Sequence, residues 1–139
     1  MSFRYWKGAH TKHRIRTHLV FIPKYRRRVI KGKVAIRIKN LFYQACHVNK
    51  WWIDALGIES DHVHMVIQHK ARESVADVVK ILKGGSSRKI RLEFPELEEF
   101  LWGDSFWSDG YFAESVGVVN EEVVKNYIEK HNEKSIEGD

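Results

Sequence analysis

Residues 51–68 read WWIDALGIESDHVHMVIQ, and this stretch predicts a β-hairpin. Two runs rich in β-branched and aromatic side chains, 51–58 and 62–68, flank the short polar link Glu59-Ser60-Asp61. Such runs favour strands, and a link this short joins antiparallel neighbours. We therefore expect two paired strands here, from which the rest of the fold can be worked outward.

The chain before the hairpin predicts a strand and then a helix. Residues 17–22 are a short apolar run stopped by Pro23, which suits a buried strand. The apolar residues that follow are spaced as on one side of a helix over about 33–49: Val34, Ile38, Leu41, Phe42 and Ala45. Cys46, the single cysteine, lies among them and is expected to be a small core side chain.

The chain after the hairpin predicts a helix, a strand and a final helix. Ser74 with Asp77 makes a start similar to a capping box, and the helix that follows is weakened at Gly84-Gly85. A short strand is expected near 110–116, and a last helix over about 121–134 behind the N-cap Asn120. The order β, α, β, β, α, β, α predicts an α+β fold, a ferredoxin-like antiparallel sheet with helices on one face plus a C-terminal helix.

Length and composition favour one folded domain. The 139 residues, 43% of them hydrophobic, are expected to form a single domain over 1–139 and exclude a disordered chain. The longest purely apolar stretch, 19–22, is too short for a membrane span or a secretory signal. We therefore expect a soluble, cytoplasmic protein with no membrane partner.

Charge is distributed very unevenly along the chain. Residues 1–53 contain 14 Lys and Arg and no Asp or Glu, whereas residues 54–139 contain 10 Lys and Arg and 18 Asp and Glu. An acid-free stretch of this length favours contacts with phosphate groups. It predicts nucleic-acid binding before any motif is considered.

Two histidines could share a metal ion. His62 and His64 are two apart on an expected strand, so both imidazoles project from the same face. Imidazole is the commonest protein ligand of transition metals. A pair of histidines on a half-exposed strand is the simpler interpretation when nothing else accompanies it.

The expected last helix carries a second pair. Tyr127 and His131 are four residues apart and so lie on one side of that helix. The tyrosine alone is more simply an amphipathic side chain packed with Val123 and Val124. Together with the histidine pair, however, a third ligand and a phenol nucleophile would suit attack on a polarised phosphorus.

At these residues the sequence resembles a known family, the single-tyrosine HUH transposases of the insertion sequence 200/605 group. The motif His-hydrophobic-His is present as His62-Val63-His64. The resemblance covers most of the chain and also includes, in order, 18–28 (HLVFIPKYRRR), 79–88 (VKILKGGSSR), 106–112 (FWSDGYF) leading to 115–117 (SVG), and Tyr127-Ile128. One position departs: the family pattern has Gln four residues after the Tyr, where this chain has His131.

The resemblance implies a DNA transposase. By it, Tyr127 is the nucleophile that cuts and rejoins single-stranded DNA through a 5′-phosphotyrosine intermediate at insertion-sequence ends, and His62, His64 and His131 hold Mg²⁺ or Mn²⁺. It also implies DNA hairpins as partners and a homodimer with composite active sites, with Gly117 as a candidate hinge. Transfer through a covalent link needs no nucleotide cofactor.

Two basic groups are expected to bind the DNA. The first is the segment Lys24, Tyr25, Arg26, Arg27 and Arg28, which combines charge with a possible stacking ring; the second is Lys83, Arg88, Lys89 and Arg91 on the second helix. A solvated basic loop is the alternative for the first. Asp61 is either a ligand or a partner that orients a histidine, although strand alternation points it away from both if the strand includes it. His18 is expected to be either a core or a DNA-facing residue.

A different class of function stays open. A ferredoxin-like module could bind nucleic-acid hairpins without cleaving them. Loss of activity with retained binding in a Tyr127→Phe variant separates the two interpretations.

Overall fold

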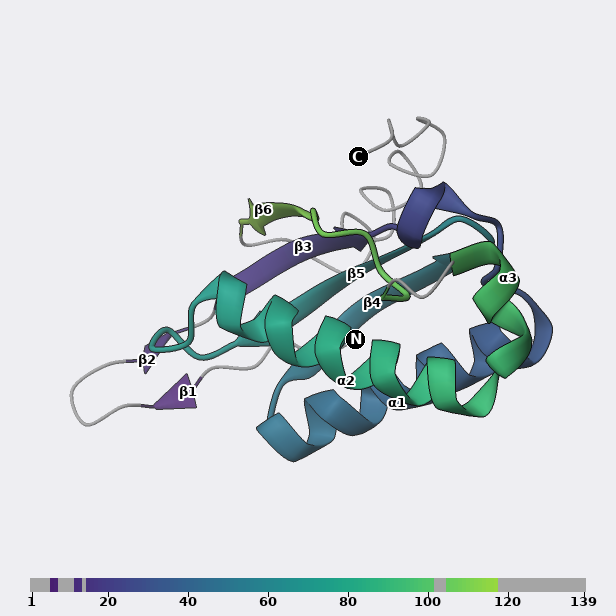
Figure 1. Ribbon diagram of the computed structural model, residues 1–139. Helices are drawn as coiled ribbons and strands as arrows, with labels where there is room; N and C mark the ends of the chain where they lie inside the picture. Colours follow the sequence, from purple (N-terminus) through teal and green to yellow (C-terminus); the bar gives the residue numbers. More distant parts are fainter. Residues whose placement is uncertain (1–5, 8–11, 14, 102–104, 118–139) are drawn as a thin grey trace.

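A four-stranded antiparallel sheet forms the centre of the molecule in the computed structural model, which describes residues 6, 7, 12, 13, 15–101 and 105–117. Its strands are β3 (Ile15–Phe21), β4 (Trp52–Glu59), β5 (His62–His69) and β6 (Phe112–Val116), in the order β4-β5-β3-β6 (Figure 1). Counted among these four, the order is second, third, first, fourth, with every neighbouring pair antiparallel. This is the ferredoxin-like arrangement, so the predicted fold class is confirmed. The predicted C-terminal helix over 121–134 lies outside the described residues.

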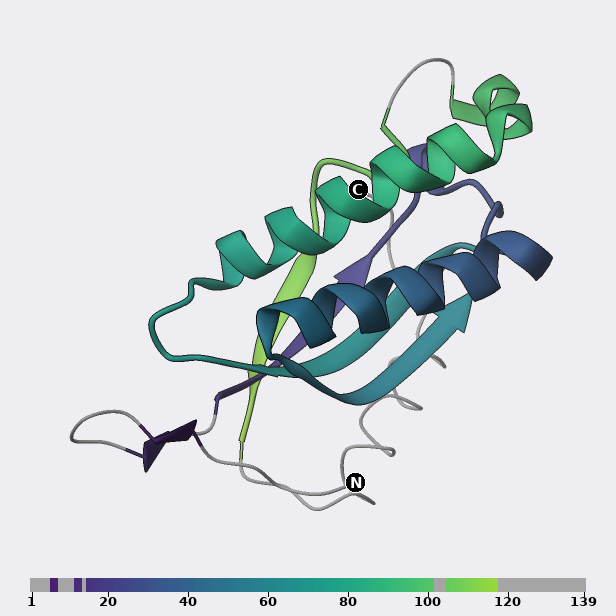
Figure 2. The ribbon, with the colours of Figure 1, turned by 90° about the horizontal axis from the view of Figure 1, so that it is seen from below.

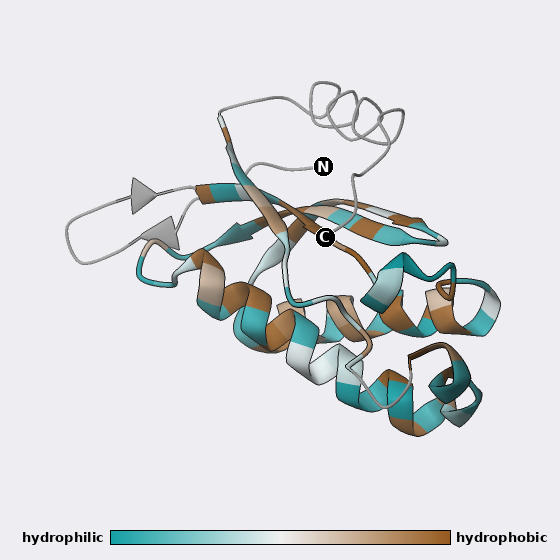
Figure 3. Ribbon diagram, turned by 45° about the horizontal axis from the view of Figure 1, so that its top comes forward, coloured by the Kyte–Doolittle hydropathy of each residue, from teal (hydrophilic) through white to brown (hydrophobic). Residues whose placement is uncertain are grey.

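Two long helices cover one face of the sheet. Helix α1 (Gly32–Asn49) and helix α2 (Val75–Glu93) run side by side across this face, in front of the strands in Figure 2. Apolar and polar residues alternate around both helices (Figure 3), as expected when one side of each packs on the sheet. No helix in the described part of the chain is long and apolar enough to cross a membrane.

Shorter elements complete the described fold. They are the two-residue strands β1 (Trp6–Lys7) and β2 (Lys12–His13), the 3-10 helices η1 (Lys24–Arg26) and η2 (Pro95–Leu97), and α3 (Glu98–Leu101). Strands β1 and β2 pair with each other, a hairpin that the sequence analysis did not predict.

Helix α2 continues through Gly84-Gly85, where the sequence suggested a weak point. The helix begins as predicted, with the Ser74 side chain accepting a hydrogen bond of 3.0 Å from the Asp77 backbone N–H. Buried residues lie on both sides of the glycines, at Leu82 and Ser86. Packing against the core therefore outweighs the low helix propensity of glycine.

The two faces of the sheet differ in chemistry. On β5 the side chains of Val63, Met65 and Ile67 join the core between the sheet and the helices. The alternate residues, which include His62, His64 and Gln68, face the other side. That side also carries an ion pair between Arg16 and Asp54, with Nε and Oδ2 at 2.8 Å and both side chains 1% exposed. Polar groups are thus buried on the face that carries the histidines.

The strand register gathers the loops of interest at one end of the sheet. Phe21 pairs with Val63, and Val20 pairs with Phe112. The segment after β3, the β4–β5 turn and the residues before β6 therefore meet at that end. Backbone hydrogen bonds join them: Ile30 N–H donates to Ser60 O at 3.0 Å, and Lys24 N–H donates to Phe106 O at 2.8 Å.

Candidate active site

His62 and His64 project from the same face of β5, the face away from the helices. Their ring centroids are 5.5 Å apart, with the ring planes inclined by 53°. Both are buried, His62 at 7% and His64 at 1% exposure. Two adjacent imidazoles in a site shielded from bulk water suit a shared divalent cation.

The space for the His64 ring is provided by a glycine on the neighbouring strand. Gly57 pairs with His64 across β4 and β5. A Cβ added at position 57 would lie 2.3 Å from Nε2 of His64, so any other residue would occupy the place of the ring. This role of Gly57 was not predicted from the sequence.

Asp61 contacts His62 directly. Its Oδ1 lies 2.9 Å from Nδ1 of His62, and its Oδ2 accepts a hydrogen bond of 3.2 Å from Nε of Arg26. The expectation that strand alternation points Asp61 away does not apply, because residues 60 and 61 form the turn and β5 begins at His62. A turn residue is free to fold its carboxylate back along the strand.

The surroundings of Asp61 favour its charged form. Its partial burial acts to raise the pKa, but the hydrogen bonds and charges of His62 and Arg26 together outweigh burial and lower it. The carboxylate therefore stays ionised beside His62. An ionised carboxylate is the partner that most strongly orients a ligand imidazole.

His18 belongs to the same buried cluster of rings. It is fully buried on β3, with its ring edge-on to His64 at a centroid distance of 6.0 Å and to Phe112 at 5.8 Å. Of the two expectations for His18, the described structure places it inside the protein. No group of three or more metal-ligating side chains with the geometry of a metal site occurs among the described residues.

The basic segment after β3, residues 24–28, lies beside Asp61 and His62. Arg26 contacts Asp61, and Arg28 Nη1 lies 3.5 Å from Oγ of Ser60 in the same turn. A cavity of about 560 Å³ opens next to the segment, and its lining includes Tyr25, Arg26, Arg27 and Arg28. The basic side chains that were expected to bind DNA phosphates therefore lie at the same end of the sheet as the two histidines.

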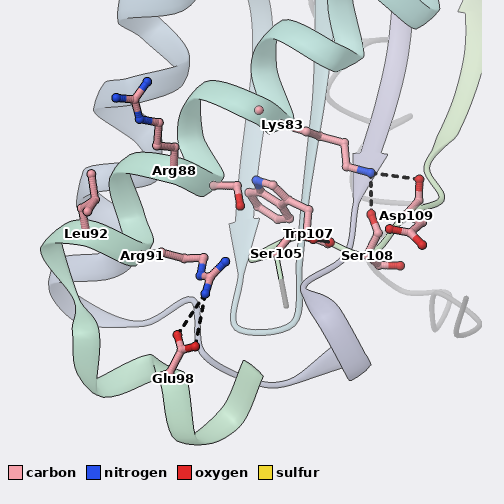
Figure 4. A pocket seen from close by; sticks show the side chains of 11 residues that line it. Lys83, Arg88, Arg91, Leu92, Glu98, Ser105, Trp107, Ser108 and Asp109 are labelled. Atoms are coloured by element: carbon pink, nitrogen blue, oxygen red, sulfur yellow. Dashed lines mark hydrogen bonds and ion pairs between the residues drawn. The ribbon is translucent and has the colours of Figure 1, made fainter. Parts of the chain in front are cut away.

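The second predicted basic group is divided between two surfaces of α2. Lys83, Arg88 and Arg91 line a cavity of about 780 Å³, whereas Lys89 lines a groove shared with α1. The Lys83 ammonium donates hydrogen bonds to the carbonyl oxygens of Ser108, Asp109 and Gly110. Arg91 pairs with Glu98 at 3.2 Å, and Figure 4 shows this pair together with the contacts of Lys83 with Ser108 and Asp109. Lys83 thus holds the segment that leads into β6.

Tyr127 and His131, the predicted nucleophile and third ligand, lie outside the described residues. The described part therefore brings together His62, His64, Asp61 and Arg26. From the sequence, Asp61 was expected to be either a ligand or a partner that orients a histidine, and its contact with Arg26 was not predicted.

The fold and this end of the sheet define a class: a ferredoxin-like α+β domain whose central strand presents two histidines beside a basic loop. The family model described as "Transposase IS200 like" matches residues 11–131. The chain belongs to this family of IS200-like transposases, and transposition is its general function.

Individual relatives agree with this assignment. The chain is 30% identical to the ISDra2 transposase TnpA of Deinococcus radiodurans over 128 residues, which cover 92% of this chain and 91% of that protein. It is 29% identical over 131 residues to the transposase for insertion sequence element IS200 of Salmonella typhimurium, covering 94% of this chain and 86% of the other.

Solved structures show the same fold. A crystal structure of a candidate transposase from Deinococcus radiodurans R1 superposes with a TM-score of 0.74 at 29% identity, over 90% of this chain and 96% of that one. A REP-associated tyrosine transposase bound to a REP hairpin has a TM-score of 0.57 at 11% identity, over 94% of this chain and 68% of the other. The second likeness supports the fold alone.

Proposed function

We propose that this transposase cuts and rejoins single-stranded DNA at the ends of its insertion sequence, with Tyr127 as nucleophile and His62, His64 and His131 as ligands of Mg²⁺ or Mn²⁺. The observation that carries the proposal is the buried imidazole pair at the basic end of the sheet. Family membership indicates the class of reaction, and the residues named here are of the types that this chemistry requires.

The donor set fits a divalent cation. Asp61 lies at Nδ1 of His62, which leaves Nε2 as the nitrogen suited to a metal, and Gly57 leaves room for the His64 ring. When bound, the cation would polarise a phosphate oxygen and help to neutralise the charge that develops there. Imidazole at position 131 in place of an amide suits Mn²⁺ at least as well as Mg²⁺.

The residues of the chain have distinct tasks in the proposed reaction. The phenol oxygen of Tyr127 forms a bond to phosphorus while the bond from phosphorus to the 3′ oxygen breaks, which gives a 5′-phosphotyrosine and a free 3′-OH. In the reverse sense, a 3′-OH attacks the phosphotyrosine and releases the phenol. The basic segment 24–28 holds neighbouring phosphates. The covalent link keeps the phosphodiester energy, so joining needs no nucleotide.

The partners are proposed on the same basis. The DNA forms hairpins at the element ends, and it is bound by the segment 24–28 and by Lys83, Arg88, Lys89 and Arg91 of α2. Lys83, Arg88 and Arg91 line one cavity, and Lys89 lies in a separate groove shared with α1. The protein acts on the nucleoid, in the cytoplasm, as a homodimer with composite sites. Mixing Tyr127→Phe and His64→Ala subunits tests the dimer, because activity returns only when one subunit supplies the tyrosine and the other the histidines.

A covalent-adduct assay tests the central proposal. Purified wild type, Tyr127→Phe and His64→Ala are each incubated with single-stranded oligonucleotides from both flanks of the gene, with and without Mn²⁺, and separated on a denaturing gel. Tyr43→Phe is the matched control, since Tyr43 is exposed on α1. We expect a Mn²⁺-dependent protein–DNA band for wild type and Tyr43→Phe alone. Tight hairpin binding without any band would favour the alternative of a binding module without cleavage activity.

A further inference from the structure

The carboxylate of Asp61 joins two segments that are far apart in the sequence. One oxygen contacts Nδ1 of His62 at 2.9 Å, and the other accepts from Nε of Arg26 at 3.2 Å. An ionised carboxylate only accepts hydrogen bonds, so the proton of this contact belongs to Nδ1 of the imidazole. In the neutral ring the lone pair is then on Nε2.

We propose that Asp61 and Arg26 are positioning residues for His62: Asp61 fixes the tautomer and orientation of the imidazole, and Arg26 fixes the carboxylate. The inference rests on the proposed function in that His62 is taken as a metal ligand. It goes further by connecting the basic segment after β3 to the ligand, so that Arg26 acts on the site through Asp61 rather than on DNA phosphates alone.

Burial makes these contacts more effective than a surface ion pair. Side-chain exposure falls from 27% at Arg26 to 15% at Asp61 and 9% at His62. Exposed ion pairs are screened by water and contribute little, whereas partly buried pairs keep more of their strength. The three side chains thus form a chain of contacts that begins near solvent at Arg26 and ends at the buried ligand His62.

The backbone around Arg26 is held in a specific conformation. Tyr25 and Arg26 have φ of 59° and 50°, in the left-handed region that residues other than glycine rarely adopt. Short backbone hydrogen bonds maintain it, among them Arg26 N–H to Pro23 O at 2.8 Å and Lys24 N–H to Phe106 O at 2.8 Å. Such conformations persist where the surroundings over-determine them, and they are concentrated at functional sites.

His64 is located by different means. Its ring occupies the space above Gly57 and packs edge-on against His18. Loss of Asp61 is therefore expected to affect His62 and leave His64 in place. This asymmetry gives the proposal a readout that general loosening of the site would not produce.

The first test measures the tautomer of His62 in metal-free protein by nitrogen-15 NMR. Spectra are recorded at a pH at which the nitrogen-15 shifts themselves show neutral imidazole rings, and His62→Gln identifies the resonances. We expect protonation at Nδ1 in wild type and a shift toward Nε2 protonation in Asp61→Ala. Asp61→Asn should keep the Nδ1 proton, because the amide oxygen still accepts. If Asp61→Ala folds poorly, Arg26→Gln provides the test instead.

The control for Arg26 is its neighbour. Arg28→Gln removes the same charge from the same segment, but Arg28 contacts Ser60 and not Asp61. We expect Arg28→Gln to leave the nitrogen-15 resonances of His62 unchanged. Arg26→Gln should broaden them or shift them toward Nε2 protonation. Equal spectra for wild type, Asp61→Ala and Arg26→Gln would overturn the proposal.

The second test is Mn²⁺ affinity by calorimetric titration. Loss of a group that orients a ligand typically weakens metal binding by about 10- to 100-fold. We expect a loss in that range for Asp61→Ala, a smaller one for Arg26→Gln, and a wild-type value for Arg28→Gln. Wild-type affinity in Asp61→Ala would refute the positioning role. Failure of wild type itself to bind Mn²⁺ would contradict the proposed function. The tautomer spectra, which are recorded without metal, would still show whether Asp61 orients His62.

Discussion

Gly57 and His64 face each other across the β4–β5 pair so closely that the imidazole occupies the space of a side chain at position 57. An added Cβ would lie 2.3 Å from Nε2 and 2.7 Å from Cδ2 of His64. Contacts this short do not occur between real Cβ atoms and their neighbours, so the ring would have to move. The glycine is therefore a requirement of the histidine site.

Gly57→Ala is expected to disable the site without unfolding the protein. The methyl group displaces the His64 ring, and a misplacement of about 1 Å in a catalytic site can cost about 100-fold in rate. We expect the rate of adduct formation to fall by about that factor, with a matching loss of Mn²⁺ affinity. Circular dichroism checks that the fold is retained. A wild-type rate would show that the His64 ring can accommodate a methyl group at position 57 without loss of function.

Gly85→Ala is the matched glycine variant and is expected to stabilise the protein. Gly85 lies within helix α2, and a Cβ built there meets nothing within 4 Å. Replacing an unstrained helical glycine by alanine typically contributes about 0.5–1 kcal/mol. The urea midpoint should rise while adduct formation stays unchanged. A lower midpoint would mean that α2 needs a glycine at this position.

Much of the fold could be predicted because its elements carry strong local patterns. Alternation in the hairpin and the stripe from Val34 to Ala45 place the strands and α1 within one or two residues of their observed bounds. The β1–β2 pair was missed because two-residue strands have no periodicity to detect. Gly84-Gly85 misled because propensity is local, whereas burial of Leu82 and Ser86 is tertiary.

The candidate site could be predicted only in part. The histidine pair follows from spacing along one strand. Gly57 was not predicted, because the expected link at 59–61 would pair 58 with 62 and 56 with 64. The observed turn at residues 60 and 61 pairs 59 with 62 and therefore 57 with 64. The contact of Arg26 with Asp61 spans 35 positions. It depends on how the segment after β3 folds against the turn, and no spacing rule encodes that.

Asp54→Ala is expected to destabilise the sheet strongly. Asp54 pairs with buried Arg16 at 2.8 Å and accepts hydrogen bonds of 3.0 and 2.9 Å from Gln68. Breaking a buried ion pair from one side typically costs about 3–5 kcal/mol, because the remaining charge loses its partner. Urea unfolding measures the loss.

The control for Asp54 is on the same strand. Glu59→Ala removes a carboxylate from the exposed end of β4, where substitutions usually change stability by less than about 0.5 kcal/mol. If both variants unfolded at the same urea concentration, the Arg16–Asp54 pair would contribute nothing to the fold.

Cys46 is expected to resist thiol reagents in the folded protein. It is 2% exposed, and burial raises its pKa from 9.0 to about 12. The thiolate is the reactive form, so at mildly alkaline pH the folded chain should not react with a maleimide, whereas the urea-unfolded chain should take up one equivalent. Rapid labelling of the folded protein would contradict the burial of Cys46.

The same shift predicts how stability depends on pH. The folded-state pKa is raised above the unfolded value, so the contribution of Cys46 is complete below pH 9.0 and is lost as the pH rises toward 12. In that window the unfolded chain binds fewer protons than the folded one. Tyrosine and lysine also titrate there, so the slope is compared between wild type and Cys46→Ala. Wild type should lose up to about 1.4 kcal/mol more per pH unit, and equal slopes would mean that the thiol ionises alike in both states.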